Sequence, residues 1–151
     1  MSDDKQFREI TINFSIEEAV KLLSCCNQAI INIEDAKHNH TPIELKLSVN
    51  GVTLQGSLDK VWEIKSKLKK SIITSLGEST KNGISVKLDI TEWIKLNGCC
   101  NAAIEMEEKT ISLLPSHSNC VTVCKETIQQ IIDIKNHIKS TLNSIYGNKY
   151  I

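Results

Sequence analysis

Two adjacent pairs of cysteines, each followed by asparagine, could carry chemistry in this sequence. Cys25-Cys26-Asn27 recurs 74 residues later as Cys99-Cys100-Asn101. Thiolates are typical zinc ligands, and two crossing helices could offer four of them to one metal ion. Adjacent side chains on a helix point about 100° apart, however, and zinc sites usually space their cysteines more widely. We therefore expect small core residues, with the second cysteine of each pair buried, the first partly exposed, and no bound metal or cofactor.

The asparagines and two glutamates extend this candidate site along each helix. On a helical wheel, Asn27 and Asn101 lie at the edge of the apolar stripe, and Glu34 and Glu108 follow in nearly the same direction. Because a buried amide must be hydrogen-bonded, we expect these residues to fix how two halves of the chain pack or to line a small polar site. The candidate binding or packing residues are Cys25, Cys26, Asn27, Glu34, Cys99, Cys100, Asn101 and Glu108.

A lysine-rich run is the second candidate for binding. Lys65, Lys67, Lys69 and Lys70 lie close together, and on a helix Lys65 and Lys69 share one face. A solvated helix face is the simplest interpretation, and a patch for an anionic partner is the alternative. The eighteen basic and eighteen acidic residues cancel, and aromatic residues make up only 4% of the chain. We therefore do not expect a nucleic-acid-binding protein, which usually has a basic excess and stacking platforms.

The composition is that of a folded chain, since 40% of the 151 residues are hydrophobic. The first residues are polar and do not resemble a signal peptide, and no run is long and apolar enough to span a membrane. We therefore expect an intracellular, cytoplasmic protein whose six cysteines are reduced.

The Cys-Cys-Asn triplets belong to a longer internal similarity. Residues 10–34 align with residues 84–108 at an offset of 74, without a gap and with eleven identical positions of twenty-five. The segment 64–77 aligns more weakly with 134–147 at an offset of about 70. This pattern predicts a tandem duplication of one unit of about seventy residues.

Each unit begins with a local pattern that predicts a strand followed by a helix. Apolar and polar residues alternate over 10–14 and 84–88, which is typical of a strand with one buried face. Ser15 and Asp89 follow, each with glutamate three residues later, and this is the signature of a capping box. A helix is therefore expected to begin one residue after each of them.

The middle of each unit predicts two further strands. In the first unit they cover 43–49 and 52–54, joined by Asn50-Gly51, a strong hairpin signal. In the second unit the corresponding apolar residues lie at 111–113 and 121–123. An amphipathic helix then closes each unit and ends at a glycine.

The expected fold is therefore α+β, made of two β-α-β-β-α repeats related by a pseudo-twofold axis. Its antiparallel-rich sheet would carry the helices on one face. The closing helices should cover 58–76 and 128–145 and end at Gly77 and Gly147. The expected organisation is a polar tail at 1–8, a first repeat at 9–77, a linker at 78–83 and a second repeat at 84–147, with both repeats in one compact domain.

The function predicted from these patterns is that of a non-enzymatic binding or adaptor protein, which contacts another protein or a small ligand and could form a homo-oligomer. The sequence contains no phosphate-binding glycine loop, nucleophile elbow or metalloprotease helix, and we assign no catalytic residue. One alternative is a ligand- or metal-binding sensor at the Cys-Cys-Asn helices. Another is a weak nucleic-acid binder that uses the lysine-rich helix. No membrane partner is expected.

Overall fold

The computed structural model describes residues 8–39, 54–78 and 83–147. Helices hold 81% of these residues, and the two strands form one small antiparallel sheet. The elements, in chain order, are β1 (Glu9–Phe14), α2 (Ile16–Asn39), α4 (Leu54–Leu76), β2 (Ile84–Asp89), α5 (Ile90–Leu113) and α6 (Asn119–Tyr146).

The two strands form where the alternating pattern predicts them, and each buries one face. Ile12 pairs with Val86 at the centre, and the flanking apolar pairs are Ile10 with Leu88 and Phe14 with Ile84. All six side chains are buried, so the sheet contributes a continuous apolar face to the core. Since Val86 is the counterpart of Ile12 at the offset of 74, the ladder is symmetric about this central pair.

Both predicted capping boxes are present. The Ser15 amide donates to Glu18 Oε1 at 2.8 Å, and the Glu18 amide donates to Ser15 Oγ at 3.1 Å. Asp89 and Glu92 make the same two bonds at 3.1 and 2.8 Å. Each pair satisfies two amides that a helix leaves free at its start, so α2 and α5 begin directly after the strands, as predicted.

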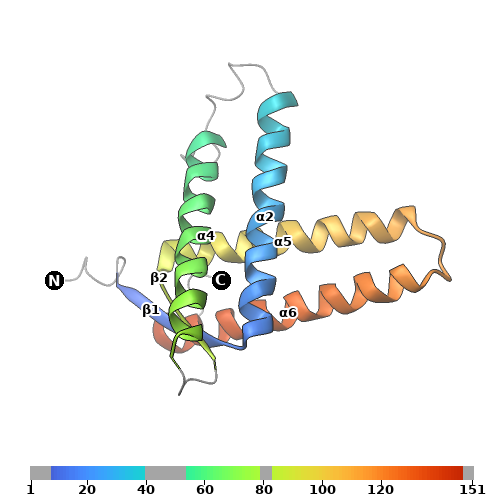
Figure 1. Cartoon of the computed structure of the whole chain (residues 1–151). Coiled ribbons are helices and arrows are strands. Elements are labelled where there is room, and N and C mark those ends of the chain that lie inside the picture. The colour runs from blue at the N-terminus through green and yellow to red at the C-terminus, as the bar shows by residue number, and fades with distance from the viewer. Residues whose placement is uncertain (1–7, 40–53, 79–82, 148–151) are drawn as a thin grey trace.

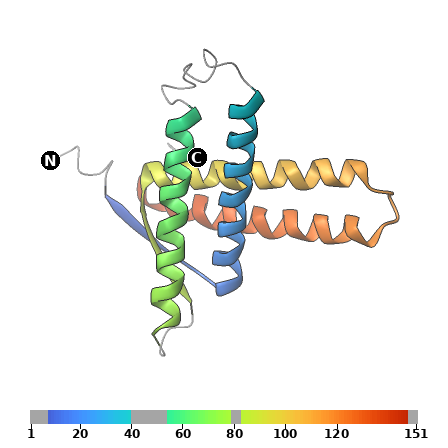
Figure 2. The same cartoon turned by 45° about the horizontal axis from the view of Figure 1, so that its top comes forward.

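The helices form two pairs that cross near the sheet. Figure 1 shows α2 beside α4 and α5 beside α6, with the second pair running across the first; Figure 2 shows the same crossing from another side. The core fills this crossing and the inner face of the sheet. Residues at helical spacing supply it from α4 and α6, namely Leu58, Val61, Ile64, Leu68, Ile72, Ile131, Ile134, Ile138 and Leu142.

The predicted sheet-rich repeat is wrong, because the second predicted pair of strands is helical. Residues 111–113 lie in α5 and residues 121–123 lie in α6. Two or three alternating residues fit a helix as well as a strand, and Val121 and Cys124 are buried at helical spacing whereas Val123 is exposed. In the first half, residues 43–49 and the Asn50-Gly51 hairpin lie outside the described residues, and Leu54 already belongs to α4.

Both closing helices end where predicted, but only one ends through a left-handed glycine. Gly147 has φ of 73° and its amide bonds to the Asn143 carbonyl at 2.8 Å. Helix α4 ends at Leu76, and Gly77 donates to the Ile73 carbonyl at 3.2 Å without a positive φ.

Candidate functional site

The four cysteines of the repeated triplets meet where α2 crosses α5. All four side chains are buried, and Cys26 hydrogen-bonds with Cys99 while Cys25 hydrogen-bonds with Cys100. The expectation that Cys25 and Cys99 would be partly exposed is therefore wrong. Helix α2 packs against both α4 and α5, so its buried face is wider than a single apolar stripe.

The crossing keeps one thiol of each hydrogen-bonded pair protonated. The hydrogen bond with Cys99 and burial raise the pKa of Cys26, and the hydrogen bond with Cys25 and burial raise the pKa of Cys100. The hydrogen bond with Cys26 lowers the pKa of Cys99, which makes Cys99 the acceptor of its pair. Among the described residues, no group of three or more potential ligands is arranged to hold a metal ion. All six cysteines are free, and these four act as small core side chains.

The asparagines and glutamates of the candidate site are not buried with the cysteines. Asn27 and Asn101 are exposed, as are Glu34 and Glu108. The interpretation of the asparagines as buried packing residues is therefore wrong. Their use as binding residues stays a prediction.

The lysine-rich run is divided between two roles. Lys67 Nζ donates to Glu92 Oε2 at 2.7 Å, and Lys65 Nζ lies 4.6 Å from the centre of the Trp62 ring. Lys69 and Lys70 are exposed. Part of the predicted anionic-partner patch is therefore engaged within the chain.

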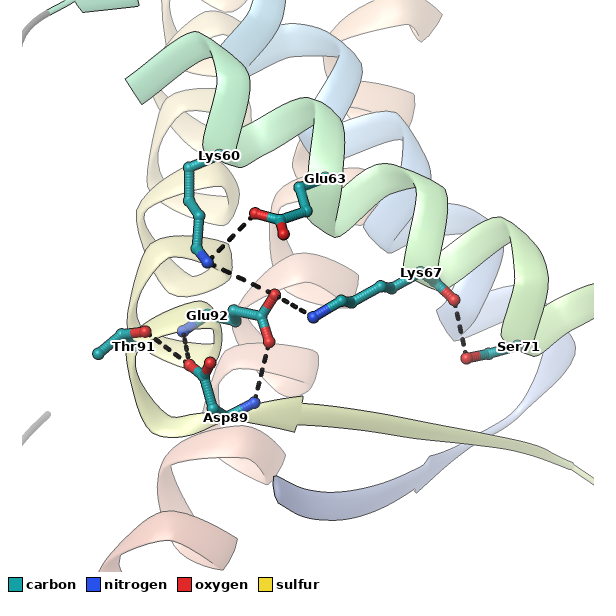
Figure 3. Close-up of polar contacts among 7 residues, drawn as sticks. All are labelled: Lys60, Glu63, Lys67, Ser71, Asp89, Thr91 and Glu92. Atoms are coloured by element: carbon teal, nitrogen blue, oxygen red, sulfur yellow. Dashed lines mark hydrogen bonds and ion pairs between the residues drawn. The ribbon is translucent and has the colours of Figure 1, made fainter. Parts of the chain in front are cut away.

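The Lys67 contact belongs to a closed junction between α4 and α5 (Figure 3). Glu92 is only 1% exposed, and its two oxygens are bonded separately. Its Oε1 accepts from the Asp89 amide, whereas its Oε2 lies 2.7 Å from Lys67 Nζ and 3.7 Å from Lys60 Nζ. A buried carboxylate is tolerated when it is paired and hydrogen-bonded in this way. Lys60 also pairs with Glu63 at 3.3 Å.

Trp93, the residue after Glu92, lies in the core. Its ring is fully buried, its Nε1 donates to the Ile10 carbonyl at 3.1 Å, and its centre lies 6.1 Å from that of Phe14. Phe14 also contacts His137 of α6, edge to face, with the ring centres 5.4 Å apart. His137 donates from Nε2 to the Asn13 carbonyl at 3.0 Å and so ties α6 to β1.

The corresponding junction between α2 and α6 is an open groove, which is the candidate functional site. Its hollow has a volume of about 590 Å³. Ile16 and Val20 lie in it with 45% and 52% of their surface exposed, whereas Ile90, the counterpart of Ile16, is 2% exposed. Apolar side chains that solvent reaches in a concave site are typical of binding surfaces. The residues that line this groove are Ile16, Glu17, Glu18, Val20, Lys21, Ser24, Gln130, Asp133 and Ile134.

The groove differs from the closed junction in its charges. Glu18 is the counterpart of Glu92, but Gln130 and His137 stand where the closed junction has Lys60 and Lys67. In the part of the chain that the structure describes, no cation forms an ion pair with Glu18. Among the described residues that line it, the groove therefore holds Glu17, Glu18 and Asp133 against a single cation, Lys21.

The sequence reasoning identified Glu18 as a capping residue but missed the groove. The replacement of two lysines by glutamine and histidine at aligned positions was the available signal, because Glu18 then lacks the two lysines that pair with its counterpart Glu92. The exposure of Ile16 had no local signal, since it depends on how the two helical pairs cross.

Comparison with protein family models, with characterised proteins and with solved structures finds no match to this chain. In residues 8–39, 54–78 and 83–147, no helix combines the length and the apolar character needed to cross a bilayer.

Proposed function

We propose that this protein is a non-enzymatic binding protein that engages another protein through the groove between α2 and α6. The observation that supports the proposal is the exposure of Ile16 and Val20 within a hollow of about 590 Å³. Burial of exposed apolar surface is the main favourable term in protein association, at about 25 cal/mol per Å² removed from water. A partner that covers these two side chains would remove their contact with water.

The competing functions lack a comparable observation. A metal sensor would need several ligands arranged around one point, and among the described residues no group of three or more potential ligands is arranged to hold a metal ion. A nucleic-acid binder would use the cations along α4, where Lys67 is bonded to Glu92 while Lys69 and Lys70 are exposed. The groove offers a partner exposed apolar surface together with, within the described residues, a carboxylate that has no ion pair.

Photo-crosslinking in the native host tests the proposal at the level of single positions. A benzophenone amino acid replaces Val20 in one variant and Val123 in the other. Both are exposed helical valines, at 52% and 61%, but Val123 does not line the groove. We expect the Val20 variant alone to give a discrete product of higher mass, which mass spectrometry then identifies.

The same experiment can contradict the proposal in two ways. Equal products from both positions, or none from Val20, would show that the groove is not a docking site. A Val20 product that contains only this chain would show that the groove is covered by a second copy, and the role as an adaptor for another protein would be wrong. A second substitution, Ile16→Glu, should abolish a genuine Val20 product.

A further inference from the structure

Within the described residues, the Glu18 carboxylate has one hydrogen-bonded oxygen and no ion pair. Its Oε1 accepts from the Ser15 amide at 2.8 Å, just as Glu92 Oε1 accepts from the Asp89 amide. The second oxygen of Glu92 pairs with Lys67 at 2.7 Å, whereas within the described residues the second oxygen of Glu18 has no ion pair. In the closed junction of the same chain, the second carboxylate oxygen thus forms an ion pair with the ammonium group of a lysine on a neighbouring helix.

The apolar side of the groove is arranged to receive a helix. Ile16, Val20 and Ser24 follow one another at intervals of four residues along α2, and all three are exposed. Rows at this spacing form the ridges that pack into the grooves of a neighbouring helix. Small and branched side chains in such a row allow close approach. Across the hollow, Asp133 of α6 is exposed and adds a second carboxylate to the rim.

We propose that the occupant of this groove is a basic amphipathic helix of a partner protein, whose lysine or arginine pairs with Glu18 as Lys67 pairs with Glu92. Its apolar residues would cover Ile16 and Val20, and its charge would complement the net negative rim formed by Glu17, Glu18, Asp133 and Lys21. This inference rests on the proposed function, because it names the chemistry of the partner at the same groove.

A displayed library tests this chemistry directly and does not require an identified partner. The probe is a phage library of stable single-helix miniproteins in which one helix face is fully randomised. Selection uses the full chain, and counter-selection uses its Val20→Glu variant. We expect the groove-dependent binders to be enriched in lysine or arginine within one turn of leucine, isoleucine or methionine.

The outcomes separate this inference from the proposed function. Groove-dependent binders with neutral or acidic faces would overturn the basic partner while the groove remains a docking site. If every binder retained full affinity for the Val20→Glu variant, the groove would not be a preferred docking site and both statements would be wrong.

A charge-neutral substitution then tests the assigned carboxylate. Glu18→Gln keeps the capping box, since glutamine also serves at this position, but it removes the charge. We expect a selected binder to lose about five- to tenfold in affinity at low salt, and the difference to shrink as salt is raised. Glu34→Gln, an exposed position on the same helix outside the groove, should change affinity less than about twofold. Equal losses for both variants would overturn the pairing with Glu18.

Discussion

The two helix junctions place similar sequences in different surroundings. Where α4 meets α5, Ile90 and Glu92 are 2% and 1% exposed, whereas α2 leaves the corresponding Ile16 45% exposed beside α6. The closed junction surrounds its carboxylate with two lysines, and the open one does not. A carboxylate can be buried only when cations and hydrogen bonds offset its desolvation. The difference therefore follows from charge as much as from apolar residues.

The two halves also differ in the size of one buried side chain at aligned positions. Trp93 of α5 corresponds to Ala19 of α2 at the offset of 74, and both are fully buried. The large ring fills the space between α5 and β1 and donates to the Ile10 carbonyl. The alanine brings no comparable volume to the other half. A large core ring and a pair of lysines thus distinguish the closed junction from the open one.

The largest effect on stability is expected from truncation of the buried Trp93 side chain. Trp93→Ala should lower the free energy of unfolding by about 3–5 kcal/mol, because it leaves a cavity and removes the hydrogen bond to the Ile10 carbonyl. Trp62→Ala is the control, since that ring is 46% exposed, and it should cost about 1 kcal/mol or less. Urea denaturation followed by circular dichroism measures both without relying on tryptophan fluorescence. Similar losses for the two variants would contradict the assignment of Trp93 to the core.

Truncation of the paired isoleucines tests the comparison directly. Ile90→Ala should cost about 2–4 kcal/mol, because its side chain is buried at the closed junction. Ile16→Ala should cost about 1 kcal/mol or less, because much of that side chain already contacts water. Thermal and urea unfolding of the two variants measure both losses in the free energy of unfolding. If Ile16→Ala were as costly as Ile90→Ala, the groove would be closed in solution.

Removal of a lysine from the closed junction should have a smaller effect. Lys67→Ala leaves the buried Glu92 with only the longer contact to Lys60, and we expect a loss of about 1–2 kcal/mol. The figure is below that of a fully buried pair, because the Lys67 side chain is 40% exposed and solvent screens the interaction. Lys69→Ala, an exposed neighbour on the same helix, should stay within about 0.5 kcal/mol.

The same pair predicts a dependence on alkaline pH. The hydrogen bond with Glu92 raises the pKa of Lys67 above its ordinary value, and burial lowers it by less. The pair therefore stabilises the fold fully below the pKa of an unfolded lysine, at about 10.4, and the contribution is lost as pH rises through the higher folded value. The stability difference between the protein and Lys67→Ala should be constant near neutral pH and shrink above about pH 10.4. A difference that persists in strong alkali would contradict a charged pair.

The sequence predicted those parts of the fold that are decided within a few residues. The strands at 10–14 and 84–88 follow from alternation, and the starts of α2 and α5 follow from Ser15 and Asp89 with their glutamates. The strands at 111–113 and 121–123 were wrong because so short an alternation does not exclude a helix. A long helix that buries Val121, Cys124 and Ile131 on one side is favoured by tertiary packing over the local pattern.

The candidate site could be predicted only in part. The repeated spacing of the four cysteines allows them to meet at a helix crossing, but their complete burial depends on two neighbouring helices packing against α2. The exposure of Asn27 depends on the same arrangement. The groove between α2 and α6 is formed by residues more than a hundred positions apart, and their mutual position is not contained in any local pattern.

The smallest effect on stability is expected at the asparagines. It tests whether these repeated residues hold the fold together or are simply exposed. Asn27→Ala and Asn101→Ala should each change the free energy of unfolding by less than about 0.5 kcal/mol, because both side chains are exposed and alanine is the better helix former. Cys26→Ser provides the contrast at the adjacent residue, since it places a hydroxyl in a fully buried position and should cost about 1–3 kcal/mol. Urea denaturation under reducing conditions measures all three. A loss above about 1 kcal/mol for either asparagine would mean that its amide is bonded within the fold, and the crossing of α2 and α5 would then be organised by the asparagines as well as by the thiols.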